Sequence, residues 1–191
     1  MASPTPTTPP TKHLEDYRPP AFLIEQVDLR FELEPADTRV TATLRLRRNG
    51  RHELPLVLDG RGLTTESVAL DGAMLSPEAR VIGAETLTIA AVPDAFTLET
   101  VVRIRPDANT SLMGLYVSGG MFCTQCEAEG FRRITWFLDR PDVMARYRVR
   151  IEADRARYPV LLANGNPVAS GDLPGGRHVA VWDDPFPKPA Y

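Results

Sequence analysis

Histidine and cysteine, the residues that most often hold zinc in proteins, are scarce in this sequence. The 191 residues contain three histidines, His13, His52 and His178, and no two stand four residues apart, so a His-Glu-x-x-His motif cannot be placed. The two cysteines, Cys123 and Cys126, form one Cys-x-x-Cys, which is half of a four-ligand site. No βαβ pattern surrounds them, as a thioredoxin-like pair would require. We expect reduced, partly buried thiols and no metal bound by this chain.

Long apolar runs and an excess of one charge are also missing. No stretch of eighteen apolar residues exists, and residues 1–12 are rich in Thr and Pro rather than basic and then apolar. The sequence therefore predicts neither a membrane-spanning helix nor a secretory signal, and a cytoplasmic location is the default. The net charge of -3 indicates no binding to nucleic acid or to an anionic membrane.

Alternation with a period of two is the main pattern that is present. Apolar and polar residues alternate over residues 27–34 and again over 40–47, with the turn-forming Pro35-Ala36-Asp37 between them. This pattern predicts an antiparallel hairpin with one wet face. Turn residues also stand at Asp71-Gly72 and at Asn164-Gly165-Asn166. Further short strands are predicted at residues 54–58, 67–74, 86–90, 96–105, 147–151, 160–162 and 178–182.

Short strands separated by turn residues indicate an all-β fold. We expect an antiparallel, strongly bent, saddle-like sheet or a sandwich with very little helix, since only residues 142–145 indicate a helical turn. Residues 1–12 are predicted to be a disordered lead, 13–183 a β-rich domain, and 184–191 a proline-rich connector. The three prolines of that connector, at 185, 187 and 189, should forbid a central strand.

A dense group of polar residues occupies positions 123–132. Two carboxylates, two thiols, a carboxamide and an arginine stand there in turn-prone sequence, which a binding surface explains better than a core does. Three arginines are expected to brace this loop by pairing with two aspartates, and these residues are Arg132, Arg140, Arg146, Asp139 and Asp142. Structural roles are expected for Trp136, Trp182 and His178.

Several blocks of the sequence carry a resemblance to a known family. They are residues 114–116, the run Cys123-Thr124-Gln125-Cys126-Glu127-Ala128-Glu129-Gly130-Phe131-Arg132, and residues 136–146, 158–166 and 176–189. Their order and spacing resemble the amino-terminal domain of bacterial aminopeptidase N, a zinc metalloaminopeptidase of the gluzincin family. Residues 16–31 are similar to the opening strand of that family, whereas residues 53–100 match only in pattern.

The resemblance implies a zinc-dependent exopeptidase that releases N-terminal amino acids from peptides. This segment would be its β-rich first domain, packed over a thermolysin-like catalytic domain that holds the zinc and the catalytic glutamate. The implied partners are peptide N-termini and the enzyme's own catalytic domain. No catalytic residue and no metal ligand is expected in this chain, which should be inactive alone.

The resemblance also implies substrate-binding roles for Gln125 and Glu127. A free α-amino group is largely an ammonium at neutral pH, and the carboxylate of Glu127 would complement that charge. The Gln125 carbonyl oxygen can accept a hydrogen bond from the same group, or the side chain can bracket the first residue of the peptide. Met121 and Phe122 are candidates for lining the pocket of that residue, although an apolar strand end has the same pattern.

Other interpretations stay open at this point. Glu127 can be a solvated loop charge or an ion-pair partner of Arg132 or Arg133. Glu129 is expected to support the loop through an ion pair or a hydrogen bond, and Gly130 to permit a backbone geometry that a side chain would hinder. The whole chain can also be a free-standing, non-catalytic β-rich module that binds peptides or acts as a scaffold.

Overall fold

The computed structural model describes residues 13–191. The predicted disordered lead, residues 1–12, lies outside the described residues. The strands are β1 (Phe22–Glu32), β2 (Thr38–Arg48), β3 (Leu56–Asp59), β4 (Thr64–Leu70), β5 (Ala73–Met74), β6 (Val81–Ile82), β7 (Thr86–Ile89), β8 (Ala95–Ile104), β9 (Gly114–Ser118), β10 (Met121–Gln125), β11 (Ala145–Asp154), β12 (Asn166–Leu173) and β13 (Arg177–Lys188). Three-residue 3-10 helices join some of them, namely η1 (Leu14–Asp16), η2 (Pro77–Ala79), η3 (Pro106–Ala108), η4 (Phe131–Arg133) and η5 (Pro174–Gly176).

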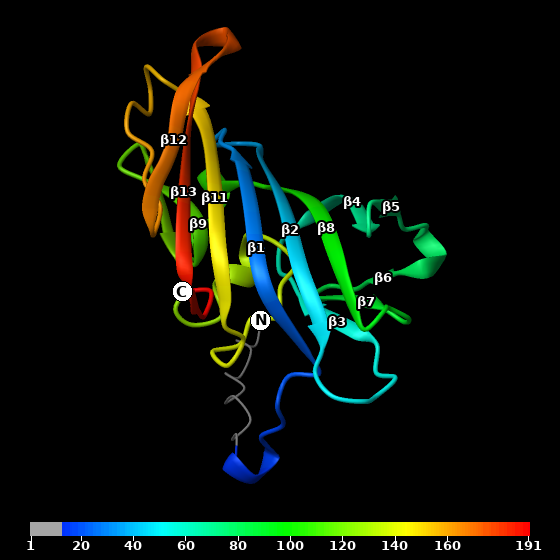
Figure 1. The fold of residues 1–191 in the computed structure, drawn as a ribbon. Coiled ribbons are helices and arrows are strands. Elements are labelled where there is room, and N and C mark those ends of the chain that lie inside the picture. The colour runs from blue at the N-terminus through cyan, green and yellow to red at the C-terminus, as the bar shows by residue number, and fades with distance from the viewer. Residues whose placement is uncertain (1–12) are drawn as a thin grey trace, which may run out of the picture.

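The strands form one large sheet and two small ones. The large sheet has the order β12-β13-β11-β1-β2-β8-β4-β5, and the small sheets are β3-β7-β6 and β10-β9. Figure 1 shows the strands from β12 to β8 side by side across the molecule, with β4 and β5 beyond β8. All pairs are antiparallel except β1 and β11, which run parallel from Gln26↔Arg146 to Glu32↔Glu152. The all-β fold with very little helix is confirmed, and its large sheet is mixed.

The alternation in the sequence places one face of the large sheet in the core. Val27 on β1 lies opposite Leu44 on β2, which lies opposite Leu98 on β8, and all three side chains are fully buried. Leu58 and Leu87 oppose each other in the small β3-β7 pair and are equally buried. These residues belong to one hydrophobic cluster, so the large sheet and the small sheet share a core. The predicted hairpin of residues 27–34 and 40–47 is therefore confirmed.

Two predicted elements are wrong. Residues 160–162 form a loop rather than a strand, with Val160 and Leu162 68% and 71% exposed and only Leu161 buried. The chain also makes no helical turn at residues 142–145, because β11 already begins at Ala145. Val143 and Ala145 are both fully buried, so the packing of the sheet overrides the weak helical pattern.

Other strands carry little sequence pattern. The hairpin of β9 and β10 is built around Gly119 and Gly120, both with positive φ, and every residue of β12 except Leu173 is exposed. Residues 184–188, which were expected to belong to a connector, instead continue β13 through Pro185 and Pro187 to Lys188. Its pairing with β12 ends at Asp183, so the prolines lie where only β11 is a neighbour.

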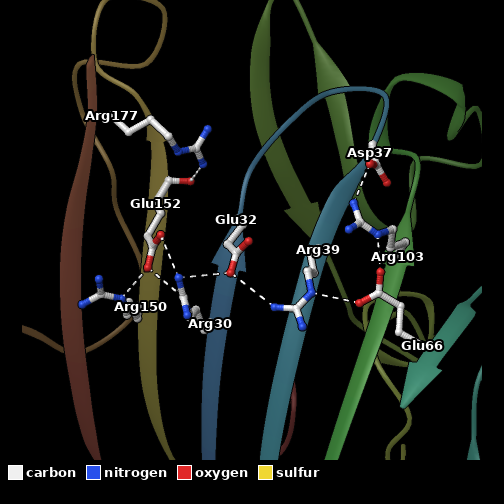
Figure 2. A network of polar contacts seen from close by, with 9 residues as sticks. All are labelled: Arg30, Glu32, Asp37, Arg39, Glu66, Arg103, Arg150, Glu152 and Arg177. Atoms are coloured by element: carbon white, nitrogen blue, oxygen red, sulfur yellow. Dashed lines mark hydrogen bonds and ion pairs between the residues drawn. The ribbon is translucent and has the colours of Figure 1, made fainter. Parts of the chain in front are cut away.

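Ion pairs cover part of the outer face of the large sheet. Figure 2 shows acidic and basic side chains alternating across it, so that Arg30 pairs with Glu152 and Glu32, and Arg39 pairs with Glu32 and Glu66. Glu152 is the most buried member, with a side chain 7% exposed. Burial opposes its ionisation, yet hydrogen bonds from arginines hold the pKa of Glu152 below its usual value. This network ties the parallel strands β1 and β11 together on the side opposite the core.

Trp136 connects the core to the segment that precedes β11. Its side chain is 2% exposed, and its Nε1 donates a hydrogen bond to Thr65 Oγ1 at 2.9 Å. The ring lies directly against Gly60, where an added Cβ would come within 2.1 Å of Trp136 Cε3. Gly60 is therefore required by space, because the buried ring has no room to move.

Gly60→Ala should lower the free energy of unfolding by about 3 kcal/mol, because overpacking a filled core usually costs about 1–3 kcal/mol or somewhat more. Urea unfolding followed by tryptophan fluorescence measures the effect. The matched control is Gly171→Ala on β12, where an added Cβ meets no atom within 4 Å. Equal losses in the two variants would contradict the role of the Trp136 contact.

Candidate functional site

The polar segment that the sequence singles out begins at the end of β10. Gln125 is the last residue of that strand and pairs with Gly114 of β9. The chain then turns through residues 126–130, with Gly130 N donating to Cys126 O at 3.0 Å, and enters η4 at Phe131. We call residues 125–130 the recognition loop, after the substrate-binding roles that the resemblance implies for Gln125 and Glu127.

Gly130 is fixed by the close approach of the chain to itself. An added Cβ would lie 2.5 Å from Gln125 O and 2.7 Å from Cys126 Cα. Its φ of -92° is available to any residue, so the requirement for glycine comes from space and not from backbone conformation. The expectation that a side chain would hinder this geometry is confirmed.

A buried ion pair holds η4 in place behind the recognition loop. Arg132 donates from its backbone N and from Nε to Asp139 Oδ2, both at 3.0 Å, and from Nη2 to Asp139 O. The Asp139 side chain is 2% exposed. Asp59 approaches from β3, accepts from Asp139 N at 3.2 Å and lies 3.9 Å from Arg132. Burial raises the pKa of Asp59, and the nearby Arg132 charge works against that rise.

The other predicted braces are only partly found. Arg140 pairs with Asp142 at 2.7 Å, and Tyr17 O–H donates to the same carboxylate at 3.1 Å. Glu129, with a φ of +66°, lies 3.7 Å from Arg132, which confirms its expected role in supporting the loop. Arg146 is exposed on β11 and forms no ion pair with Asp139 or Asp142, so that prediction is wrong.

Gln125 and Glu127 lie together on the exposed side of the recognition loop. Gln125 Nε2 donates a hydrogen bond to the backbone carbonyl of Glu127 at 3.0 Å, which leaves the Gln125 Oε1 atom as an acceptor. The Glu127 carboxylate is exposed and forms no ion pair or hydrogen bond with any residue from 13 to 191. Glu127 is therefore not the partner of Arg132 or Arg133 within the described residues.

A cleft of about 920 Å³ lies beside these two side chains. Gln125, Glu127 and Met121 line it together with Phe122, and its walls come from β1, β11, η4 and the loop after β11. Its mainly apolar lining includes Leu29, Phe31, Phe131, Tyr147 and Leu161. Nothing in the sequence connects those residues with the site, because their pattern is that of strand and core positions.

The two thiols have different surroundings. Cys126 is 9% exposed, and burial, together with the nearby Asp139 charge, raises the pKa of its thiol to about 12. Cys123 is partly exposed on β10, and both cysteines are free. The expectation of reduced, partly buried thiols agrees with this arrangement.

The described residues do not provide a zinc site. Between residues 13 and 191 no three His, Cys, Asp or Glu side chains are grouped as metal ligands. His178 Nε2 lies 2.7 Å from Tyr158 O, and His52 Nε2 lies 2.8 Å from Ala21 O, so both rings serve the structure. Trp182 Nε1 donates to Leu161 O at 3.2 Å, which supports its expected structural role.

Comparison with known proteins assigns the chain to a family. A family model, the peptidase M1 N-terminal domain, matches residues 26–191. The chain belongs to the peptidase M1 N-terminal domain family. Aminopeptidase N of Caulobacter vibrioides is 59% identical over 184 residues, and that of Escherichia coli is 48% identical over 183 residues. Each alignment covers 96% of this chain and 21% of the relative, so this M1 domain spans about a fifth of their length.

Solved structures agree with the family. The structure of Legionella pneumophila aminopeptidase A in complex with aspartic acid matches this M1 domain with a TM-score of 0.88 and 34% identity, over 94% of this chain and 22% of that one. An M1 zinc metallopeptidase from Deinococcus radiodurans bound to a Tyr-Ser-Ala substrate has a TM-score of 0.74 at 17% identity, which supports the fold alone. In the part of the M1 domain that the structure describes, no helix has the length and apolarity to cross a membrane.

Alkylation should distinguish the two cysteines of the M1 domain. A thiol with a pKa of about 12 is ionised in about one molecule in ten thousand at pH 8, and the thiolate is the reactive form. Iodoacetamide should therefore modify Cys123 at least about tenfold faster than Cys126. Mass spectrometry of peptides after timed quenching gives both rates, with the urea-unfolded protein as control, where the rates should converge. Faster modification of Cys126 in the folded protein would show that its burial is wrong.

Arg132→Met should destabilise the M1 domain by about 3 kcal/mol, because the buried Asp139 carboxylate loses its positively charged partner and keeps only the hydrogen bond from the backbone N of residue 132. Arg140→Met removes a more exposed ion pair and should cost about 1 kcal/mol or less. Chemical denaturation of the two variants gives the difference. A loss in Arg132→Met no larger than that in Arg140→Met would argue against the buried pair as the support of the loop.

Proposed function

We propose that this chain is the amine-recognition domain of a zinc-dependent aminopeptidase, which releases single amino acids from peptide N-termini. The family assignment and the relatives named aminopeptidase N support this proposal. The observation that carries the role of the domain is the exposed carboxylate of Glu127, which has no partner among residues 13–191, beside an oriented Gln125 amide at the edge of the cleft.

The chemistry of a peptide N-terminus fits this pair. The α-ammonium has three N–H donors and one positive charge, and the ordinary pKa of an α-amino group is about 7.7–8.0. Glu127 supplies a carboxylate that forms no ion pair with any described arginine. Gln125 Oε1 supplies a second acceptor without a second negative charge. A blocked or internal peptide nitrogen carries no such charge, so the pair would favour free N-termini.

Fixing the amine also selects the bond that reacts. Zinc held by the catalytic domain of such an enzyme would supply the activated water. Gln125 and Glu127 would hold the peptide's first nitrogen at a set place, so that only the first peptide bond lies within reach of that water. The close packing at Gly130 and the Arg132–Asp139 pair would hold the loop in one conformation, and so fix the position of that nitrogen.

The cleft also carries exposed apolar side chains. Met121, Val160 and Leu162 at the cleft are 64%, 68% and 71% exposed, and side chains of this kind suit an apolar surface of the catalytic domain. Met121 would then line the pocket for the first side chain from one side. A cytoplasmic location stays a prediction from the sequence.

Glu127→Gln in the intact enzyme should lower kcat/KM for an unblocked dipeptide substrate by about thirtyfold or more, since loss of a desolvated charge partner costs about 2 kcal/mol or more. The variant keeps the shape of the side chain and removes only its charge. Glu99→Gln, an exposed position on β8 outside the cleft, is the matched control and should behave as the parent. A kcat/KM for Glu127→Gln within about twofold of the parent would overturn the proposed role.

A further inference from the structure

A second, smaller cavity borders η4. It has a volume of about 310 Å³ and shares only Leu115 with the lining of the cleft. Three arginines from separate segments line it, namely Arg61 after β3, Arg105 after β8 and Arg133 in η4. The amine-recognition role proposed above uses none of these three side chains.

Contacts between three segments explain why the arginines line one cavity. Arg61 N donates to Arg132 O at 2.8 Å, which ties the segment after β3 to η4. Gly114 of β9 lies against Arg133, where an added Cβ would be 2.7 Å from the Arg133 Cβ. Asn109, just after η3, donates from Nδ2 to Leu115 O at 2.8 Å and so holds the third segment against β9. These contacts hold the three segments that line the cavity against one another.

The charged side chains that line the cavity are all positive. Of the described residues that line it, none is an Asp or a Glu. Arg61 and Arg105 each have an ion pair outside the lining, with Glu85 and Asp107, both at 3.2 Å. These pairs are exposed, so they are weak and exchange readily. Arg133 forms no side-chain ion pair or hydrogen bond with residues 13–191.

We propose that this cavity binds a phosphate-type oxyanion, either free phosphate or the phosphate group of a small monoester. Guanidinium groups present paired N–H donors that match the oxygens of phosphate, and three of them suit a doubly charged anion better than a single carboxylate. Thr110 and Ser111 also line the cavity and add hydroxyl groups. The volume is at the lower end for ligand sites, which suits an anion or a small ester.

Binding here would reach the recognition loop through η4. Arg132 and Arg133 are neighbours in that short helix, and Arg132 holds Asp139 while Arg133 lines the anion cavity. A bound anion would restrain η4 through the Arg133 side chain, in addition to the restraint that the Arg132–Asp139 pair provides. The proposal itself concerns binding and does not depend on the aminopeptidase role.

Isothermal titration of the intact protein tests the proposal, with inorganic phosphate, phenyl phosphate and acetate as probes in chloride buffer of constant ionic strength. Phosphate should bind saturably, and Arg133→Gln should weaken it about tenfold or more, because a charge-assisted hydrogen bond is lost. Arg61→Gln, at an exposed position where misfolding is not expected, should weaken it in the same direction. Arg146→Gln, an exposed arginine on β11 away from the cavity, is the matched control and should bind as the parent does.

The outcomes separate the sources of the anion. Binding of inorganic phosphate alone identifies free phosphate, and comparable binding of phenyl phosphate identifies a monoester. Phosphate bound to a metal elsewhere in the intact protein would be unaffected by Arg133→Gln. The proposal is overturned if phosphate shows no saturable binding up to about 10 mM, if acetate binds as well as phosphate, or if both arginine variants bind like the parent.

Discussion

The ion pair between Arg132 and Asp139 is the contact on which the geometry of the recognition loop depends. Arg132 Nε pairs with the Asp139 carboxylate, which is almost fully buried, and two further hydrogen bonds run from the Arg132 backbone N to that carboxylate and from Nη2 to the Asp139 backbone carbonyl. A buried carboxylate without a partner is costly, so the chain cannot leave this arrangement without exposing or neutralising Asp139. Because Arg132 sits in η4, the pair fixes where the preceding residues 125–130 can run.

The second constraint is the lack of space around Gly130. The chain passes so close to Gln125 O and Cys126 Cα that no side chain fits there. The Arg132–Asp139 pair fixes the C-terminal end of the loop, and the close packing at Gly130 fixes its interior. Gln125 and Glu127 lie on its outer side. The ion pairs that support the loop join Arg132 to Asp139 and to Glu129. The Glu127 carboxylate takes no part in them and is available for a ligand.

The sequence predicted the elements that alternate and missed those that do not. Strands β1, β2 and β8 carry long apolar and polar alternation because one face is buried and one is wet, and each was predictable. Strand β12 is exposed on both faces, so burial imposes no pattern on it. Residues 160–162 show the opposite failure, since an apolar run exists there without a neighbouring strand to pair with.

Some residues of the candidate site could likewise be predicted from the sequence, and others could not. The resemblance pointed to Gln125 and Glu127, and the charge pattern pointed to Arg132 and Asp139, because opposite charges seven residues apart across a turn can meet. The parallel pairing of β1 with β11 had no such local signal, because its partners are more than one hundred residues apart. The walls of the cleft depend on that pairing, so Leu29 and Tyr147 could be placed at the site only by the three-dimensional structure.

Helix η4 joins the two cavities of the domain physically. Phe131 lines the large cleft, Arg132 holds Asp139, and Arg133 lines the small basic cavity, so three consecutive side chains point to three different surroundings. A three-residue 3-10 helix has three residues per turn and spreads its side chains around its axis in this way. Any shift of the η4 backbone would therefore change both cavities together, since the helix carries side chains that line each of them.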